Sequence, residues 1–81
     1  MYSYFKELPN DCYPLIEFNG RKYSRYFVDP KAEALYRLCY NGMYKRVRVN
    51  YDLKFSMMDD DEEIHNHSWK RFRALYFPEE V

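Results

Sequence analysis

Hydrophobic and polar residues alternate without interruption along residues 46–55. The odd positions carry Val47, Val49, Tyr51, Leu53 and Phe55, and the even positions carry Arg46, Arg48, Asn50, Asp52 and Lys54. A period of two places one set on each face of a strand, so this segment predicts a half-buried sheet. Because strands are most often five or six residues long, we expect a bend at 50–52 that makes two strands of it.

A second pair of strands is predicted at 13–18 and 21–28, on either side of Asn19-Gly20. This dipeptide favours a tight two-residue hairpin turn because both of its residues tolerate a positive φ angle. With that turn, Ile16 lies opposite Tyr23 and both side chains point to the same face of the sheet.

The segment 29–42 carries the start and stop signals of a helix. Asp29 is a favoured N-cap residue, Pro30 suits the first helical position, and Asn41-Gly42 is typical of a helix end. At about 100° per residue, one apolar arc gathers Ala34, Leu35, Leu38 and Cys39. Tyr36 and Tyr40 fall outside this arc, so a helix over 30–41 leaves both tyrosines on its exposed side.

A second helix is predicted from about residue 61 to residue 77. Its apolar stripe comprises Ile64, Ser68, Phe72 and Leu75, and Pro78 ends it. Acidic residues crowd its first turn and basic residues its later turns, which the helix dipole favours.

This order of elements predicts an α+β fold, strand-strand-helix-strand-strand-helix, with a four-stranded antiparallel sheet and two helices on one face. We expect a single compact domain over 1–81, with an aromatic lead-in at 1–12 and a tail at 79–81. The predicted core consists of Ile16, Phe18, Val28, Leu35, Leu38, Val47, Val49, Leu53, Phe55, Ile64, Phe72 and Leu75.

Composition supports a small core that is rich in rings, since 47% of the residues are hydrophobic and 21% are aromatic. The formal net charge is zero, but the two signs are separated along the chain. Residues 21–50 hold eight Lys or Arg against two acids, a balance of +6, and residues 51–63 hold Lys54 against six acids, a balance of −5. Either the fold neutralises this separation internally or it carries a surface of two signs, and internal neutralisation is the simpler expectation.

No catalytic or cofactor motif is present, so we expect a protein that is not an enzyme, has no cofactor and has no metal site. Cys12 and Cys39 lack metal-ligand spacing, which favours free thiols in a reducing compartment. On one helix, His65 and His67 point about 200° apart and cannot share an ion, so His65 is expected partly buried and His67 solvated. We interpret the acidic run 59–63 as helix capping. The sequence contains no stretch that could span a membrane, which favours a cytoplasmic protein.

The surface supports two functional hypotheses. The first is an interaction protein that binds and inhibits or modulates a host or regulatory protein through Tyr36, Arg37, Tyr40 and Tyr44, because Tyr and Arg are enriched at binding hot spots. In this it resembles the small accessory proteins of phages and other mobile elements. The alternative is a nucleic-acid-binding module that uses Arg21, Lys22, Arg25, Lys45, Arg46 and Arg48. The oligomeric state stays open.

Overall fold

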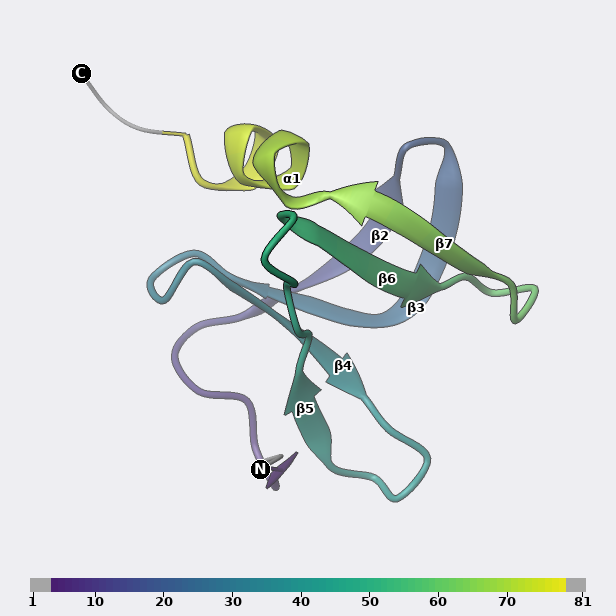
Figure 1. Cartoon of the computed structure of the whole chain (residues 1–81). Coiled ribbons are helices and arrows are strands. Elements are labelled where there is room, and N and C mark those ends of the chain that lie inside the picture. The colour runs from purple at the N-terminus through teal and green to yellow at the C-terminus, as the bar shows by residue number, and fades with distance from the viewer. Residues whose placement is uncertain (1–3, 79–81) are drawn as a thin grey trace.

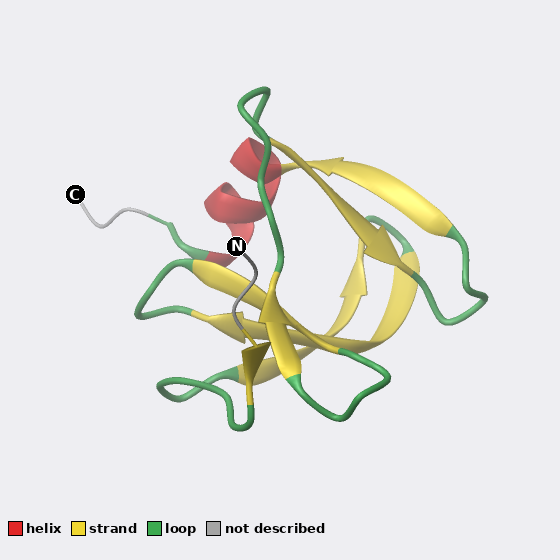
Figure 2. Cartoon of the chain, turned by 60° about the horizontal axis from the view of Figure 1, so that its bottom comes forward, coloured by secondary structure: helices red, strands yellow, loops and turns green. Residues whose placement is uncertain are grey.

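The computed structural model describes residues 4–78, which form a five-stranded antiparallel sheet, a two-stranded hairpin and one helix (Figure 1). The strands are β1 (Tyr4–Phe5), β2 (Tyr13–Phe18), β3 (Arg21–Asp29), β4 (Ala34–Leu38), β5 (Tyr44–Arg46), β6 (Lys54–Met58) and β7 (Ile64–Ser68), and the helix is α1 (Trp69–Tyr76). The larger sheet has the order β1-β5-β4-β3-β2, and β6 pairs with β7. Figure 2 shows that sheet is the dominant element and that the helix lies at one end of the molecule.

The predicted fold class is therefore wrong. Instead of four strands and two helices on one face, the described residues form five strands in one sheet, two in a second sheet, and a single helix. That helix has eight residues, and no helix among residues 4–78 is long and apolar enough to cross a membrane.

The hairpin predicted around Asn19-Gly20 is confirmed. β2 pairs with β3 across this turn, and both turn residues have a positive φ, 52° for Asn19 and 77° for Gly20. The predicted register is wrong, however, because a bulge between Leu15 and Glu17 shifts the pairing. Leu15 is consequently buried, whereas Ile16 is exposed rather than part of the core.

The helix predicted over 30–41 is wrong, because its central residues form β4. The signals of the helix start serve a turn instead: Asp29 is fully buried, and its Oδ1 accepts the N–H groups of Lys31 and Ala32 at 3.1 Å. Asx-turns and helix N-caps share this chemistry. At the other end, Gly42 has a φ of 80° and lies in the β4–β5 turn rather than at a helix end.

The long alternating segment forms strand only at its two ends, in β5 and β6. Between them the chain runs as an irregular connection with a turn at residues 50–53. The two predicted strands do not pair with each other, since β5 joins β4 and β6 joins β7. The predicted sidedness nevertheless holds for part of it, because Val47 and Val49 pack against the core while Arg46 and Arg48 are exposed.

The predicted second helix begins eight residues too early. Residues 59–63 form the loop of the β6–β7 hairpin, and Ile64–Ser68 form β7. The helix starts only after Ser68, whose side chain accepts the N–H of Arg71 at 3.4 Å as an N-cap. Of the predicted stripe, Phe72 is buried, whereas Ile64 and Leu75 are exposed.

The core lies between the larger sheet, the β6–β7 hairpin and α1. Of the predicted core residues, Phe18, Val28, Leu35, Phe55 and Phe72 are buried, and Leu53 is exposed. The sequence pattern missed several further buried residues: Leu15, Tyr23, Tyr26, Ala34, Tyr36, Met57 and Phe77. The Phe72 ring lies at the centre, with its centroid 5.3 Å from that of Phe18 and 5.4 Å from that of Phe55.

We expect Phe72→Ala to lower the free energy of unfolding by about 3–5 kcal/mol, because it removes a ring that the core cannot replace. Leu75→Ala on the same helix is the matched control, since Leu75 is 57% exposed, and it should change stability by no more than about 0.5 kcal/mol. Urea denaturation at equilibrium measures both values. Equal losses in the two variants would contradict this packing of α1.

Candidate functional site: a basic cleft beside an acidic hairpin loop

A cleft of about 300 Å³ opens where β4, the chain after β5 and the start of β6 come together. Five cationic residues line this cleft, and no carboxylate of residues 4–78 does: Arg37, Lys45, Arg46, Arg48 and Lys54. We call it the basic cleft and these five residues its cations. Tyr26 and Phe55 contribute aromatic surface to its lining.

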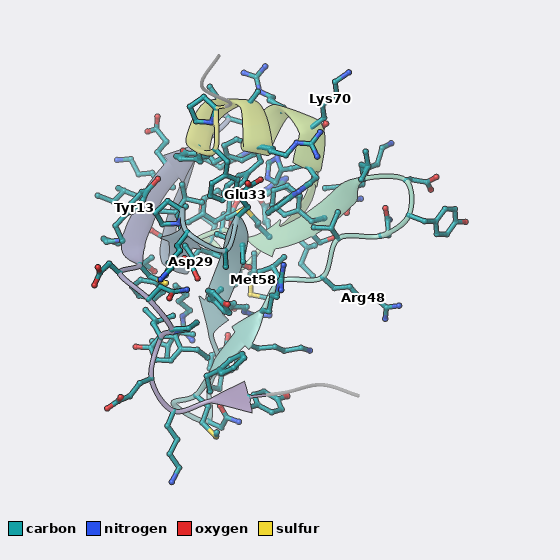
Figure 3. The ribbon with its side chains drawn as sticks, turned by 90° about the vertical axis from the view of Figure 1, so that its left-hand side faces the viewer. Tyr13, Asp29, Glu33, Arg48, Met58 and Lys70 are labelled. Carbon is teal, nitrogen blue, oxygen red and sulfur yellow. The ribbon has the colours of Figure 1, made fainter. Side chains whose placement is uncertain are left out.

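Local pairing places Arg46 and Arg48 on the same side of the chain. The N–H of Val47 donates to the carbonyl of Leu35 at 2.8 Å, which holds this stretch along β4. Because side chains alternate along extended backbone, the packing of Val47 against the core turns its neighbours outward. Figure 3 shows Arg48 pointing away from the body of the protein.

A turn at residues 50–53 returns the chain so that Lys54 faces the same cleft. Asn50 closes this turn, since its Oδ1 accepts the N–H groups of Asp52 and Lys54, both at 3.0 Å. Tyr51 lies within the turn and is 95% exposed. The turn thus presents an uncovered aromatic ring next to the lining residues Asn50 and Lys54.

Three of the five cations of the basic cleft have no close acidic partner among the described residues. Arg46, Arg48 and Lys54 have no ion pair within 4.0 Å with any carboxylate of residues 4–78. The Nε of Arg37 is buried and has no hydrogen-bond acceptor in the described part of the chain. A buried donor without an acceptor costs about 1–3 kcal/mol, and the guanidinium of Arg37 keeps its positive charge at the lining of the cleft.

Residues 59–63, which form the loop of the β6–β7 hairpin and which we call the acidic loop, border a second cleft of about 140 Å³. Arg25, Tyr40 and the other side of Arg37 line it, together with Asp59, Asp60 and Glu62. The guanidinium carbon of Arg25 lies 4.5 Å from the centre of the Tyr40 ring, a cation–π contact. Acidic and basic residues therefore meet in this mixed cleft, while all the charged residues that line the basic cleft are cations.

The structure brings together half of the residues predicted for nucleic-acid binding. Lys45, Arg46 and Arg48 all line the basic cleft. Arg21 and Lys22 begin β3 at the β2–β3 turn, and Arg25 lines the mixed cleft instead. Arg37, which was predicted on the protein-binding surface, also lines the basic cleft, and Lys54 was missed; the pairing of β4 with β5 and the turn at 50–53 bring these two residues to this place.

The four residues predicted to contact a partner protein do not share one exposed surface. Tyr36 is only 4% exposed and its ring packs edge-on against Phe5 at 5.8 Å, so the exposed position predicted for it is wrong. Tyr44 is half-buried and packs against Phe27, with ring centroids 5.6 Å apart. Arg37 is half-buried, and only Tyr40, at 71%, is largely exposed.

A polar network that is exposed at Arg71 and Asn19 and buried at Tyr23 and His67 attaches the β6–β7 hairpin to the larger sheet. Arg71 Nε donates to Asn19 Oδ1 at 2.8 Å, which orients the Asn19 amide so that its NH₂ group donates to His67 Nδ1 at 3.1 Å. His67 Nδ1 therefore carries no proton, and Nε2–H donates to the Tyr23 hydroxyl at 2.8 Å. Burial raises the pKa of Tyr23 to about 12, so its hydroxyl stays neutral. The predicted solvated position of His67 is wrong, because this residue is buried.

His65 is half-buried, as predicted, and lies in a different setting on the same strand. Its Nε2 is close to the carboxylates of Asp59 and Glu63, and these three side chains could together hold a metal ion. No other cluster of three such ligand groups occurs within residues 4–78.

Comparisons of the chain with protein-family models, with curated proteins and with solved structures give no match. We therefore infer function from the geometry and charge of the two clefts and of the hairpin loop.

The polar network around His67 makes stability depend on pH. Burial, followed by the nearby His65 and Arg21, holds the pKa of His67 below its ordinary value of 6.5. The unfolded chain therefore binds the proton first as pH falls, so this contribution to stability is complete above pH 6.5 and is lost progressively below it. We expect the free energy of unfolding to decline between about pH 7 and pH 5, and His67→Gln to flatten that decline.

Urea denaturation across this pH range tests the expectation, and an NMR titration of the His67 Cε1 proton checks its cause. The NMR midpoint should lie below 6.5. Superimposable stability profiles for wild type and His67→Gln would contradict this role of His67.

Proposed function

We propose that this protein binds single-stranded nucleic acid, with backbone phosphates in the basic cleft and a base stacked on Tyr51. The observation that carries the proposal is the lining of one cleft by five cations and by none of the carboxylates that the structure describes. Single-strand binding combines a positively charged groove for the backbone with aromatic faces for the bases. Both features lie next to each other here.

The arrangement of the acidic residues favours this proposal over the protein-partner hypothesis. A chain of zero net charge can bind a polyanion only when its carboxylates lie away from the binding surface. The carboxylates of Asp59, Asp60 and Glu62 line the mixed cleft, and none of the described carboxylates lines the basic cleft. The acidic loop then sets one boundary of the binding surface.

A protein partner remains the second candidate, on a smaller surface than the sequence suggested. Tyr40 and Arg25 form an exposed cation–π pair at the mixed cleft, and Tyr and Arg are frequent binding hot spots. The proposed role as an inhibitor of a host protein, the absence of enzymatic activity and the cytoplasmic location all stay predictions from the sequence.

Binding of a fluorescent oligothymidylate should weaken log-linearly with salt, because phosphate contacts release counterions. Arg46→Ala and Arg48→Ala should each flatten the slope by about 0.7, the value for one phosphate of a single strand. Lys31→Ala is the matched control, since this exposed lysine lies outside the cleft and its substitution removes the same charge. Fluorescence anisotropy between about 50 and 200 mM salt measures the slopes.

Two outcomes would contradict nucleic-acid binding in the basic cleft. The first is no binding to either DNA or RNA strands at about 50 mM salt, where the electrostatic contribution is strong. The second is an equal loss of affinity in Lys31→Ala and Arg48→Ala, which would show that net charge acts without the cleft.

Tyr51→Ala tests the stacking part of the proposal separately. Loss of one stacked base costs about 1–3 kcal/mol, so affinity should fall at least fivefold while the salt slope stays unchanged. Tyr40→Ala should leave the affinity for the oligonucleotide unchanged. If Tyr40→Ala instead abolishes binding to a protein partner and Tyr51→Ala has no effect on any ligand, the second candidate replaces the first.

A further inference from the structure

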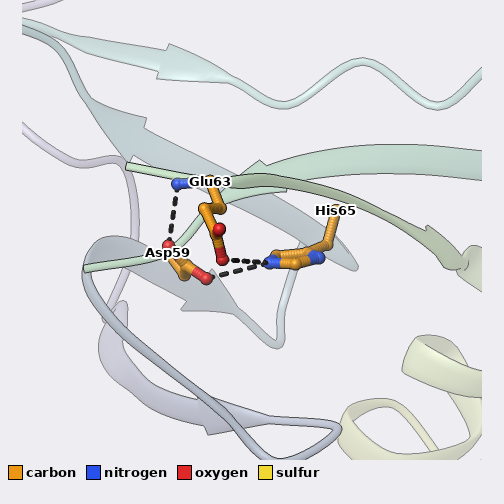
Figure 4. Close-up of side chains that lie close together, drawn as sticks. All are labelled: Asp59, Glu63 and His65. Atoms are coloured by element: carbon orange, nitrogen blue, oxygen red, sulfur yellow. Dashed lines mark hydrogen bonds and ion pairs between the residues drawn. The ribbon is translucent and has the colours of Figure 1, made fainter. Parts of the chain in front are cut away.

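Three side chains with metal-binding atoms converge beside the loop of the β6–β7 hairpin (Figure 4). Asp59 directly follows β6, Glu63 directly precedes β7, and His65 lies on β7. The Nε2 of His65 is 2.9 Å from Asp59 Oδ2 and 3.9 Å from Glu63 Oε2. All three ligand atoms lie within 4.8 Å of one another.

The backbone of the hairpin enforces this convergence. The N–H of Asp59 donates to the carbonyl of Glu63 at 2.9 Å, which closes the loop between them. Glu63 and His65 are two residues apart on extended backbone, so their side chains leave the same face of the hairpin. The helix predicted from about residue 61 does not form here, and the hairpin brings the three side chains together instead.

Backbone donors also orient the Asp59 carboxylate. Its Oδ1 accepts the N–H groups of Glu63 at 2.9 Å and Asp61 at 3.0 Å, which leaves Oδ2 directed at His65. The amide of Glu63, and then His65 and Asp61, hold the pKa of this carboxyl below its ordinary value. The carboxylate is therefore ionised and already held in position before a metal ion binds. Surrounding groups commonly orient metal ligands in this way.

We propose that Asp59, Glu63 and His65 bind one divalent transition-metal ion of the zinc type. Two ligand atoms at 2.0–2.1 Å from one tetrahedral ion are about 3.3–3.4 Å apart, and the separations of 2.9 and 3.9 Å bracket this value. One imidazole with two carboxylates is a donor set for zinc, whereas calcium and magnesium take oxygen ligands in larger numbers. Water completes the fourth position.

Charge and exposure favour an ion at this place. Glu63 is 64% exposed, so an ion has a direct path from solvent, while the buried Asp59 forms the floor of the site. Asp60, Asp61 and Glu62 in the same loop add negative charge around it. On binding, the ion takes the place of the hydrogen on His65 Nε2 that now points to Asp59, and the imidazole binds it in the neutral form with its proton on Nδ1.

Titration of chelator-treated protein with ZnCl₂ by isothermal calorimetry tests the site. We expect one ion per chain and a melting temperature that rises with zinc concentration, because the ion binds only the folded hairpin. His65→Gln and Glu63→Gln should each weaken binding at least about tenfold, the loss observed even when a group that only supports a metal ligand is removed. Glu63 is exposed, so its variant keeps the test valid if His65→Gln fails to fold.

Two controls separate this site from general attraction to acids and from the thiols. Glu62→Gln removes the same charge from the same loop without touching the cluster, so it should change the affinity for zinc by less than about twofold. A Cys12→Ser/Cys39→Ser variant should bind zinc as wild type does, since neither free cysteine belongs to the cluster.

Any of three results would overturn the proposal. They are an equal loss in Glu62→Gln and Glu63→Gln, loss of binding in the cysteine variant, and the absence of one-to-one zinc binding at 100 μM, about the weakest affinity at which a dedicated site would matter. None of these outcomes depends on nucleic-acid binding, so the metal site and the proposed function succeed or fail separately.

Discussion

The packing of the β6–β7 hairpin and α1 against the larger sheet is the interaction on which the rest of the molecule depends. Phe72 is fully buried and contacts rings from β2 and β6 at once. A domain of this size has little interior, and aromatic rings supply much apolar area per residue. Without this packing, the hairpin would be an isolated two-stranded element, which is marginally stable in water at best.

Two polar contacts fix the position of the hairpin at this apolar interface. The hydroxyl of Tyr26 accepts the N–H of Met58 at 2.8 Å, and Tyr23 is linked to His67. Both tyrosines lie on β3, and their partners lie on different strands of the hairpin. Packing alone would allow the hairpin to slide, whereas these contacts select one register against the sheet.

The fixed hairpin explains how a neutral chain carries one basic cleft and one cleft of mixed charge. β6 begins at Lys54, which lines the basic cleft, and ends directly before Asp59, which lines the mixed cleft. A strand of five residues spans about 16 Å, more than the Debye length at physiological salt. The charge separation along the sequence is therefore kept in space rather than neutralised in the basic cleft.

Local signals predicted the parts of the structure that depend on neighbouring residues. Asn19-Gly20 gave the first hairpin, and alternation gave the outward direction of Arg46 and Arg48. Asp29-Pro30 and Asn41-Gly42 led to the wrong prediction of a helix, because the same residue types occur at the ends of helices and in turns. The pairing of β4 with β3 and β5 selects a strand over a helix for this segment. This pairing buries Tyr36, and no local sequence pattern encodes it.

The candidate sites follow the same division. The cations after β5 could be read from alternation, whereas Arg37 and Lys54 join them only through strand pairing and a turn. The cluster of Asp59, Glu63 and His65 was not predicted, because the acidic run was interpreted as the cap of a helix and the histidines as residues of that helix. In a hairpin, residues two apart share a face, and residues on either side of the loop become neighbours.

Mapping of amide chemical shifts during titration with oligothymidylate tests the central claim that the hairpin completes a binding cleft with β4 and the chain after β5. The account predicts that the largest shifts fall on residues 45–56 and on Arg37, which are distant in sequence and adjacent in the cleft. The far side of the β2–β3 hairpin, including the exposed Ile16, should not respond. Shifts confined to the mixed cleft at Arg25 and Tyr40, or no shifts at low salt, would contradict it.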